Sequence, residues 1–113
     1  MAGKISIKRI IDVMLNRFPL ELAEPWDNCG LVIASSKKKT SSVVLCVDIT
    51  AACVKKAVKA GASLVLSHHP VMIKPVCRIN SLNYPDKVLE MLLSNKISAG
   101  CFHTNADNGR GGL

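Results

Sequence analysis

The sequence predicts a single α/β domain over residues 1–113, with a mostly parallel or mixed sheet and helices packed on it. The main observation is an apolar run at 42–48, a helical pattern over 51–60 and a second apolar run at 62–66. Strand, helix and strand in such close succession predict a right-handed βαβ unit with parallel strands. The composition, with 49% hydrophobic and 20% charged residues, is that of an ordinary globular protein with one core.

The first expected element is an amphipathic helix over 7–18, because apolar residues recur there every three or four positions with charged residues between them. Ser6 is a suitable N-cap, and Pro19 ends the helix because proline cannot donate to the helical ladder. An irregular connector follows over 20–28. It leads into a turn in which Gly30 can take a positive φ.

Short strands are expected at 31–34 and 42–48, separated by a lysine-rich loop that we interpret as solvated. The second of these strands ends at Asp48. Thr50 or Asp48 can cap the helix that follows, and Gly61 closes it.

The strand at 62–66 leads into Ser67-His68-His69-Pro70. Residues 71–77 are apolar but lie between prolines, so we expect an extended loop. A helix over 84–93 and a last strand over 96–102 follow, and we expect this last strand to leave an open sheet edge.

Polar side chains gather where the predicted strands end. His68 and His69 follow one strand, His103 and Asp107 follow another, and Asp48 follows a third. Ligands bind at the carboxyl ends of parallel strands, and nitrogen ligands favour Zn²⁺, Mn²⁺, Fe²⁺ or Ni²⁺ over a site for Mg²⁺ alone. A carboxylate such as Asp107 can bridge two ions, and such a centre lowers the pKa of bound water. Two adjacent histidines on their own are more often explained by one packed and one solvated ring than by a site, so the metal hypothesis depends on the other polar side chains at these strand ends.

Composition limits the other classes of function. The net charge of +7 permits nucleic-acid contact, but aromatic residues make up only 4%, so stacking platforms for bases are scarce. No apolar stretch is long enough to cross a bilayer, and no secretory signal begins the chain, which favours the cytoplasm, with the nucleus or a mitochondrion as alternatives. The five cysteines include no Cys-x-x-Cys pair, so we expect reduced, mostly buried thiols.

Several separated motifs occur in an order that resembles one known family. They are Trp26-Asp27-Asn28 with Gly30-Leu31, Asp48-Ile49-Thr50, Ser67-His68-His69-Pro70, and His103-Thr104-Asn105-Ala106-Asp107 with Gly111-Gly112. The chain resembles the N-terminal part of the dinuclear-metal proteins called NGG-one-interacting factor three-like, also known as GTP cyclohydrolase I type 2 homologues. The resemblance implies an α/β fold in toroidal hexamers with two divalent metal ions per subunit.

By this resemblance, His68, His69 and Asp107 are metal ligands. His103 and Thr104 match positions that orient the ligands or line the pocket. Family members are longer and take further ligands from a His-x-x-x-Glu motif near their C-terminus, which this sequence lacks. We therefore expect an incomplete ligand set and a domain that is incomplete relative to the family, with the missing ligands coming from absent residues, another chain or water.

Two classes of function follow. The first is a metal-dependent hydrolase acting on a nucleotide or a related phosphorylated or cyclic amide substrate, in which Asp48 or His103 moves protons. The second is a non-catalytic regulatory or protein-interaction module, because the family name refers to a transcriptional co-regulator. A thiol enzyme using Cys101 with His103 and a phosphate loop at 109–112 are less well supported alternatives.

Overall fold

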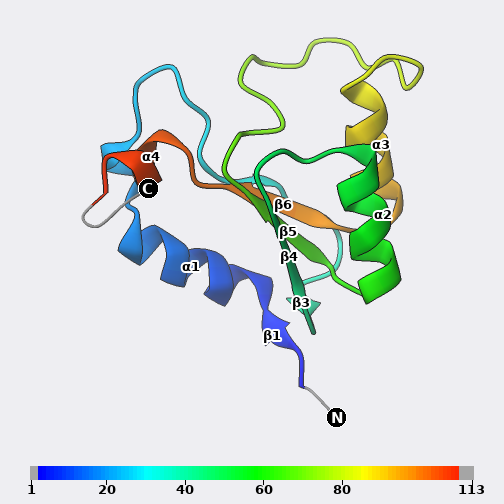
Figure 1. Cartoon of the computed structure of the whole chain (residues 1–113), viewed down its shortest axis with the longest axis horizontal. Helices are drawn as coiled ribbons and strands as arrows, with labels where there is room; N and C mark the ends of the chain where they lie inside the picture. Colours follow the sequence, from blue (N-terminus) through cyan, green and yellow to red (C-terminus); the bar gives the residue numbers. More distant parts are fainter. Residues whose placement is uncertain (1–2, 110–113) are drawn as a thin grey trace.

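The computed structural model describes residues 3–109 and shows a four-stranded mixed sheet with helices on both faces (Figure 1). The strand order is β2-β6-β5-β4. The strands are β2 (Gly30–Ile33), β4 (Val43–Cys46), β5 (Leu64–Ser67) and β6 (Ser98–Cys101). β4, β5 and β6 run parallel, whereas β2 is antiparallel to β6. The predicted α/β class with a mixed sheet is confirmed.

The predicted βαβ unit is present as β4, α2 (Ala51–Ala60) and β5. The Thr50 hydroxyl accepts a hydrogen bond from the Cys53 amide at 3.2 Å and so caps α2. Gly61 ends the helix with a φ of 70°, a conformation that glycine adopts without steric cost. Every residue of β5 is buried, as expected for an inner strand covered on both faces.

The side chains of β5 alternate between two apolar clusters on opposite faces of the sheet. Val65 packs under α2 and α3 (Asp86–Ser94). Leu64 and Leu66 pack under α1 (Ile7–Arg17), which lies across the other face (Figure 1). The α1 helix begins after the predicted N-cap, Ser6, whose hydroxyl accepts from the Arg9 amide.

The structure corrects one expectation and adds elements that the sequence pattern did not predict. The open edge expected at 96–102 is wrong, because β6 lies between β2 and β5 and the sheet edges are β2 and β4. The lysine-rich loop contains β3 (Lys39–Thr40), which pairs with β1 (Ile5–Ser6). The connector contains a 3₁₀ turn, η1 (Leu20–Leu22), and a short helix, α4 (Thr104–Asp107), follows β6. Among residues 3–109, no helix has the length and apolarity needed to span a membrane.

Gly100 lets α1 approach β6 closely. A Cβ atom at Gly100 would lie 3.0 Å from both Ile11 Cδ1 and Leu66 Cδ2. We expect Gly100→Ala to lower the free energy of unfolding by about 1–2 kcal/mol, because an added methyl group overpacks this contact. Gly3→Ala, where nothing lies within 4 Å, is the control for urea denaturation. Equal stability of the two variants would contradict the expectation.

Candidate metal centre

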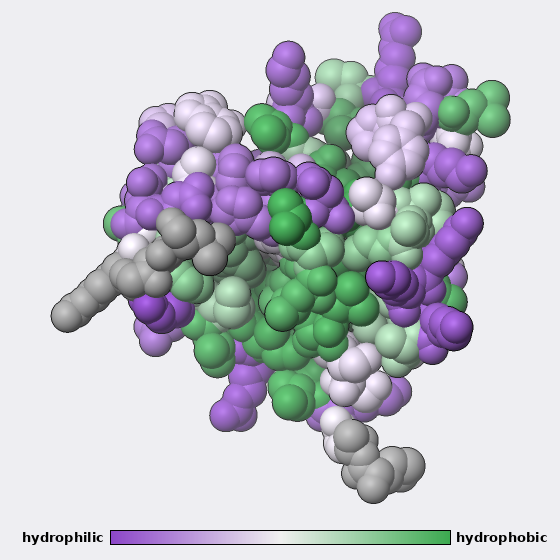
Figure 2. All heavy atoms as spheres, in the orientation of Figure 1, coloured by the Kyte–Doolittle hydropathy of each residue, from purple (hydrophilic) through white to green (hydrophobic). Residues whose placement is uncertain are grey.

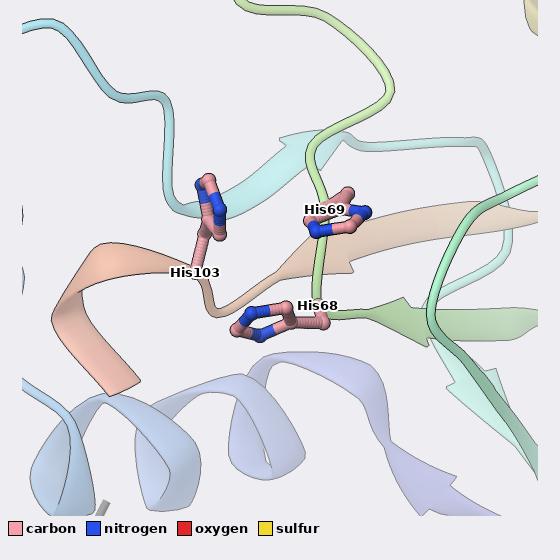
Figure 3. Close-up of side chains that lie close together, drawn as sticks. All are labelled: His68, His69 and His103. Atoms are coloured by element: carbon pink, nitrogen blue, oxygen red, sulfur yellow. The ribbon is translucent and has the colours of Figure 1, made fainter. Parts of the chain in front are cut away.

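Three histidines meet where β5 and β6 end (Figure 3). His68 and His69 directly follow β5, and His103 comes two residues after β6. The backbone holds these positions, because the His68 and His69 amides donate to Cys46 and Val47 carbonyls at 3.2 and 2.9 Å. The three ring centroids lie 5.0–5.2 Å apart. One ligand nitrogen from each ring lies within 4.8 Å of the other two.

Hydrogen bonds determine which nitrogen of each ring remains available. His68 Nδ1 lies 3.0 Å from the Phe102 carbonyl oxygen, which can only accept a hydrogen bond. A neutral His68 therefore carries its proton on Nδ1 and leaves the Nε2 lone pair free to bind a metal. An oxygen partner on one imidazole nitrogen is the usual arrangement behind a metal-binding histidine.

The other two rings have the same arrangement with carboxylates. His69 Nδ1 lies 2.8 Å from Asp48 Oδ1, and His103 Nδ1 lies 3.2 Å from Asp27 Oδ2. Each carboxylate accepts from Nδ1 and leaves Nε2 of its histidine available. Phe102, Asp48 and Asp27 thus give the three histidines the tautomer that a metal ligand needs.

Asp107 adds a carboxylate to the cluster. It is the last residue of α4, and its Oδ1 lies 3.7 Å from His68 Nε2. This distance is too long for a hydrogen bond. The side chains of Asp107 and His68 are 42% and 24% exposed, so both can reach an ion at the surface of the cluster.

Asp27 anchors the turn 25–28 to α4. Its side chain is fully buried and accepts hydrogen bonds from the hydroxyl and the amide of Thr104. Thr104 lies 77 positions after Asp27 in the sequence. Burial raises the pKa of Asp27, but the bonds from Thr104, the Asn28 amide and the Cys29 thiol outweigh burial, so the pKa falls below its usual range. Asp27 is therefore an ionised carboxylate that fixes the position of His103.

The donor set fits a divalent transition metal. Three imidazoles and a carboxylate are ligands that Zn²⁺ and similar ions accept. Zn–N bonds of about 2.0–2.1 Å place two nitrogens of one tetrahedral ion about 3.3 Å apart, and the ligand nitrogens here lie within 4.8 Å of one another.

The structure brings the five predicted site residues to one end of the sheet. His68, His69 and His103 form the cluster, Asp107 lies beside His68, and Asp48 contacts His69. His103 therefore stands among the potential ligands, although the sequence predicted a proton-transfer or orienting role for it. Asp48 is placed to orient His69.

Asp27 is the one site residue that the sequence analysis did not single out. In the sequence, Asp27-Asn28 before a glycine is sufficiently explained by a turn. The structure does contain this turn, with the Asn28 amide donating to Asp27 Oδ1. The available signal was its place in the Trp26-Asp27-Asn28 motif, which the resemblance already included.

Cys101 does not have the environment of a catalytic thiol. All five cysteines are free; Cys53 and Cys101 are buried, whereas Cys77 is exposed. Burial raises the pKa of Cys101 to about 12, and its thiol donates to the Asn28 carbonyl. We expect iodoacetamide to alkylate Cys77 and spare Cys101 in the native protein, because only thiolates react. Peptide mass spectrometry, with the denatured protein as control, measures this, and rapid native alkylation of Cys101 would reopen the thiol-enzyme hypothesis.

Comparison with known proteins places the chain in a family. It is 34% identical over 101 residues to a protein named GTP cyclohydrolase 1 type 2 from Helicobacter pylori, covering 89% of this chain and 41% of the relative. It is 33% identical over 109 residues to NIF3-like protein 1 of Drosophila melanogaster, covering 96% of this chain and 37% of the relative. The chain thus spans about two fifths of the length of these relatives.

Solved structures agree with the sequence relatives. A Bacillus cereus protein related to NIF3 superposes with a TM-score of 0.90 at 29% identity, covering 98% of this chain and 30% of that one. Reduced HcgD from Methanocaldococcus jannaschii gives a TM-score of 0.88 at 27% identity, covering 99% and 45%. The family model Duf34/NIF3 (NGG1p interacting factor 3) matches residues 5–113. The chain therefore belongs to the Duf34/NIF3 family.

Proposed function

We propose that this chain supplies a divalent-metal centre to a metal-dependent hydrolase, with His68, His69, His103 and Asp107 as ligands. The observation that supports this most strongly is the three-histidine cluster, in which an oxygen partner on each Nδ1 leaves each Nε2 available. The curated relatives named GTP cyclohydrolase 1 type 2 favour a nucleotide or a related cyclic amide as substrate. Two ions per chain, of Zn²⁺, Mn²⁺, Fe²⁺ or Ni²⁺, belong to the same proposal.

The side chains around the cluster have distinct proposed roles. A bound divalent ion supplies Lewis acidity, which lowers the pKa of a coordinated water. Asp48 orients His69, and Asp27 orients His103, each by accepting from Nδ1. Asp48 is 64% exposed, so its carboxylate can also take up a proton from solvent-side water, the role predicted from the sequence.

Metal content tests the proposal directly. The protein is purified without chelators, and the metal-to-protein ratio is measured by elemental analysis and by titration of the stripped protein with ZnCl₂. One or two ions per chain support the proposal, together with hydrolysis of a nucleotide substrate that is lost when the metal is removed and restored when Zn²⁺ is added. Absence of bound metal in a folded chain, shown by circular dichroism, overturns it for these residues.

An exposed apolar surface favours a second function, a protein-interaction module. Figure 2 shows apolar residues gathered on the face where β4 lies in Figure 1. β4 is an edge strand of the sheet. Leu45, in β4, is 75% exposed, and Val47, directly after β4, is 59% exposed. Patches of this kind on a sheet edge are sites of protein association. We propose a homo-oligomer as the first partner to test, by light scattering of the wild type and of Leu45→Lys. A monomer at all concentrations would leave other proteins as the partners of this module.

A further inference from the structure

A pocket lies beside the histidine cluster and outside the proposed ligand set. It has a volume of about 460 Å³ and is formed by the turn 25–28 and the segment 72–76. The two walls are tied together by a hydrogen bond from Asn28 Nδ2 to the Met72 carbonyl, at 2.9 Å. The turn also contacts the histidine cluster, because the carboxylate of Asp27 accepts a hydrogen bond from the His103 ring.

Trp26 lines this pocket and is unusually exposed for a tryptophan. It is the only tryptophan of the chain, and the residue is 56% exposed although tryptophan is usually well buried. Its ring meets the His103 ring edge-on, with centroids 5.9 Å apart. An exposed indole next to a potential metal ligand offers a flat surface on which another ring can stack.

Lys74 gives the same pocket a positive charge. It is the one cationic residue among those that line the pocket, and no ion pair among residues 3–109 involves it. The carboxylate that also lines the pocket, Asp27, is fully buried and engaged with Thr104 and His103. The accessible charge of the pocket is therefore positive, and its other walls include Pro25, Met72 and Ile73.

We propose that this pocket binds a planar aromatic or heteroaromatic molecule that carries an anionic group, with the ring stacked on Trp26 and the anion at Lys74. This inference rests on the proposed function in one respect, since it makes the pocket the substrate pocket of the adjacent metal centre. Binding itself needs only the indole, the ammonium group and the apolar walls. It can therefore be measured without metal.

The sole tryptophan reports on the pocket directly. The stripped protein is titrated with guanosine 5′-monophosphate, guanosine and ribose 5-phosphate, and Trp26 fluorescence is followed. We expect saturable quenching by the nucleotide, binding of guanosine about tenfold weaker because it lacks the charge, and no quenching by ribose 5-phosphate because it lacks the ring. Absence of saturable quenching by the nucleotide overturns the inference.

Matched variants assign the two contacts. Lys74→Gln is expected to weaken nucleotide binding about tenfold and to leave guanosine binding unchanged, whereas Lys87→Gln, an exposed lysine on α3 outside the pocket, changes neither. Trp26→Leu, whose binding is measured by calorimetry, is expected to bind both the nucleotide and guanosine about tenfold or more weakly than the wild type. Equal nucleotide affinities of Lys74→Gln and Lys87→Gln would overturn the role of Lys74, and unchanged affinity in Trp26→Leu would overturn stacking.

The two proposals fail separately in this design. Saturable quenching without Zn²⁺ binding supports the pocket and overturns the metal centre. Zn²⁺ binding without nucleotide quenching does the reverse.

Discussion

His103→Ala is expected to weaken Zn²⁺ binding by about 100-fold. The binding free energy of Zn²⁺ at structural sites is about 10–16 kcal/mol over four ligands, or about 3 kcal/mol per ligand. Each 1.4 kcal/mol of binding free energy changes the affinity by a factor of ten. His103 shares the cluster with His68 and His69, with ligand nitrogens within 4.8 Å of one another. Removing one imidazole from this set leaves at most two nitrogens and the Asp107 carboxylate.

The measurement is competition with a fluorescent zinc chelator. Because all three histidines of the chain are in the cluster, the control replaces a polar residue elsewhere, Asn95→Ala at the end of α3. Circular dichroism confirms that both variants fold. An affinity for Zn²⁺ in His103→Ala equal to that of the control would remove His103 from the ligand set and restore the orienting role predicted from the sequence.

Asp27→Asn is expected to lower the free energy of unfolding by about 2–4 kcal/mol. The carboxylate is buried and accepts from the hydroxyl and amide of Thr104 and from the Asn28 amide. Hydrogen bonds to a charged acceptor contribute about 1.5–3 kcal/mol each, and a side-chain amide in its place turns an N–H group towards donors. Urea denaturation followed by circular dichroism measures the change.

Asp48→Asn is the matched control, because Asp48 also accepts from the Nδ1 of a histidine but is 64% exposed. An exposed ion pair contributes at most about 1 kcal/mol, so this variant should keep its stability. Both variants should weaken Zn²⁺ binding by about 10–100-fold, because a neutral amide is a weaker acceptor for Nδ1–H than a carboxylate and can instead turn its N–H group towards the ring. Equal losses of stability in Asp48→Asn and Asp27→Asn would contradict the expectation that the buried carboxylate contributes more than the exposed one.

The parts of the fold that could be predicted are those with a signal in adjacent residues. The helical spacing of 7–18, with a serine before it and a proline after it, located α1 to within a residue. The βαβ unit was predictable because β4, α2 and β5 follow one another directly and their handedness is fixed by general rules. From that unit it followed that Asp48 lies beside the paired histidines, as the 2.8 Å contact with His69 shows.

The parts that could not be predicted depend on residues far apart in the sequence. β1 and β3 are two residues each, too short to show any periodicity, and they exist only because they pair with each other. The apolar pattern of β2 is the same for either direction of pairing, so its antiparallel contact with β6 was not visible. The burial of Asp27 likewise depends on α4, and no residue near Asp27 in the sequence indicates it.

The contacts that complete the cluster also determine when it can form during folding. His68 and His69 follow the β4–α2–β5 unit, which closes a short loop, whereas Asp27 reaches Thr104 across 77 positions and Gly30 pairs with Cys101. Contacts between distant residues form late, because closing long loops costs more chain entropy. We therefore expect the paired histidines to be in place early. His103 depends on the pairing of β6 with β5 and on its contact with Asp27, so we expect it to reach its position later than His68 and His69.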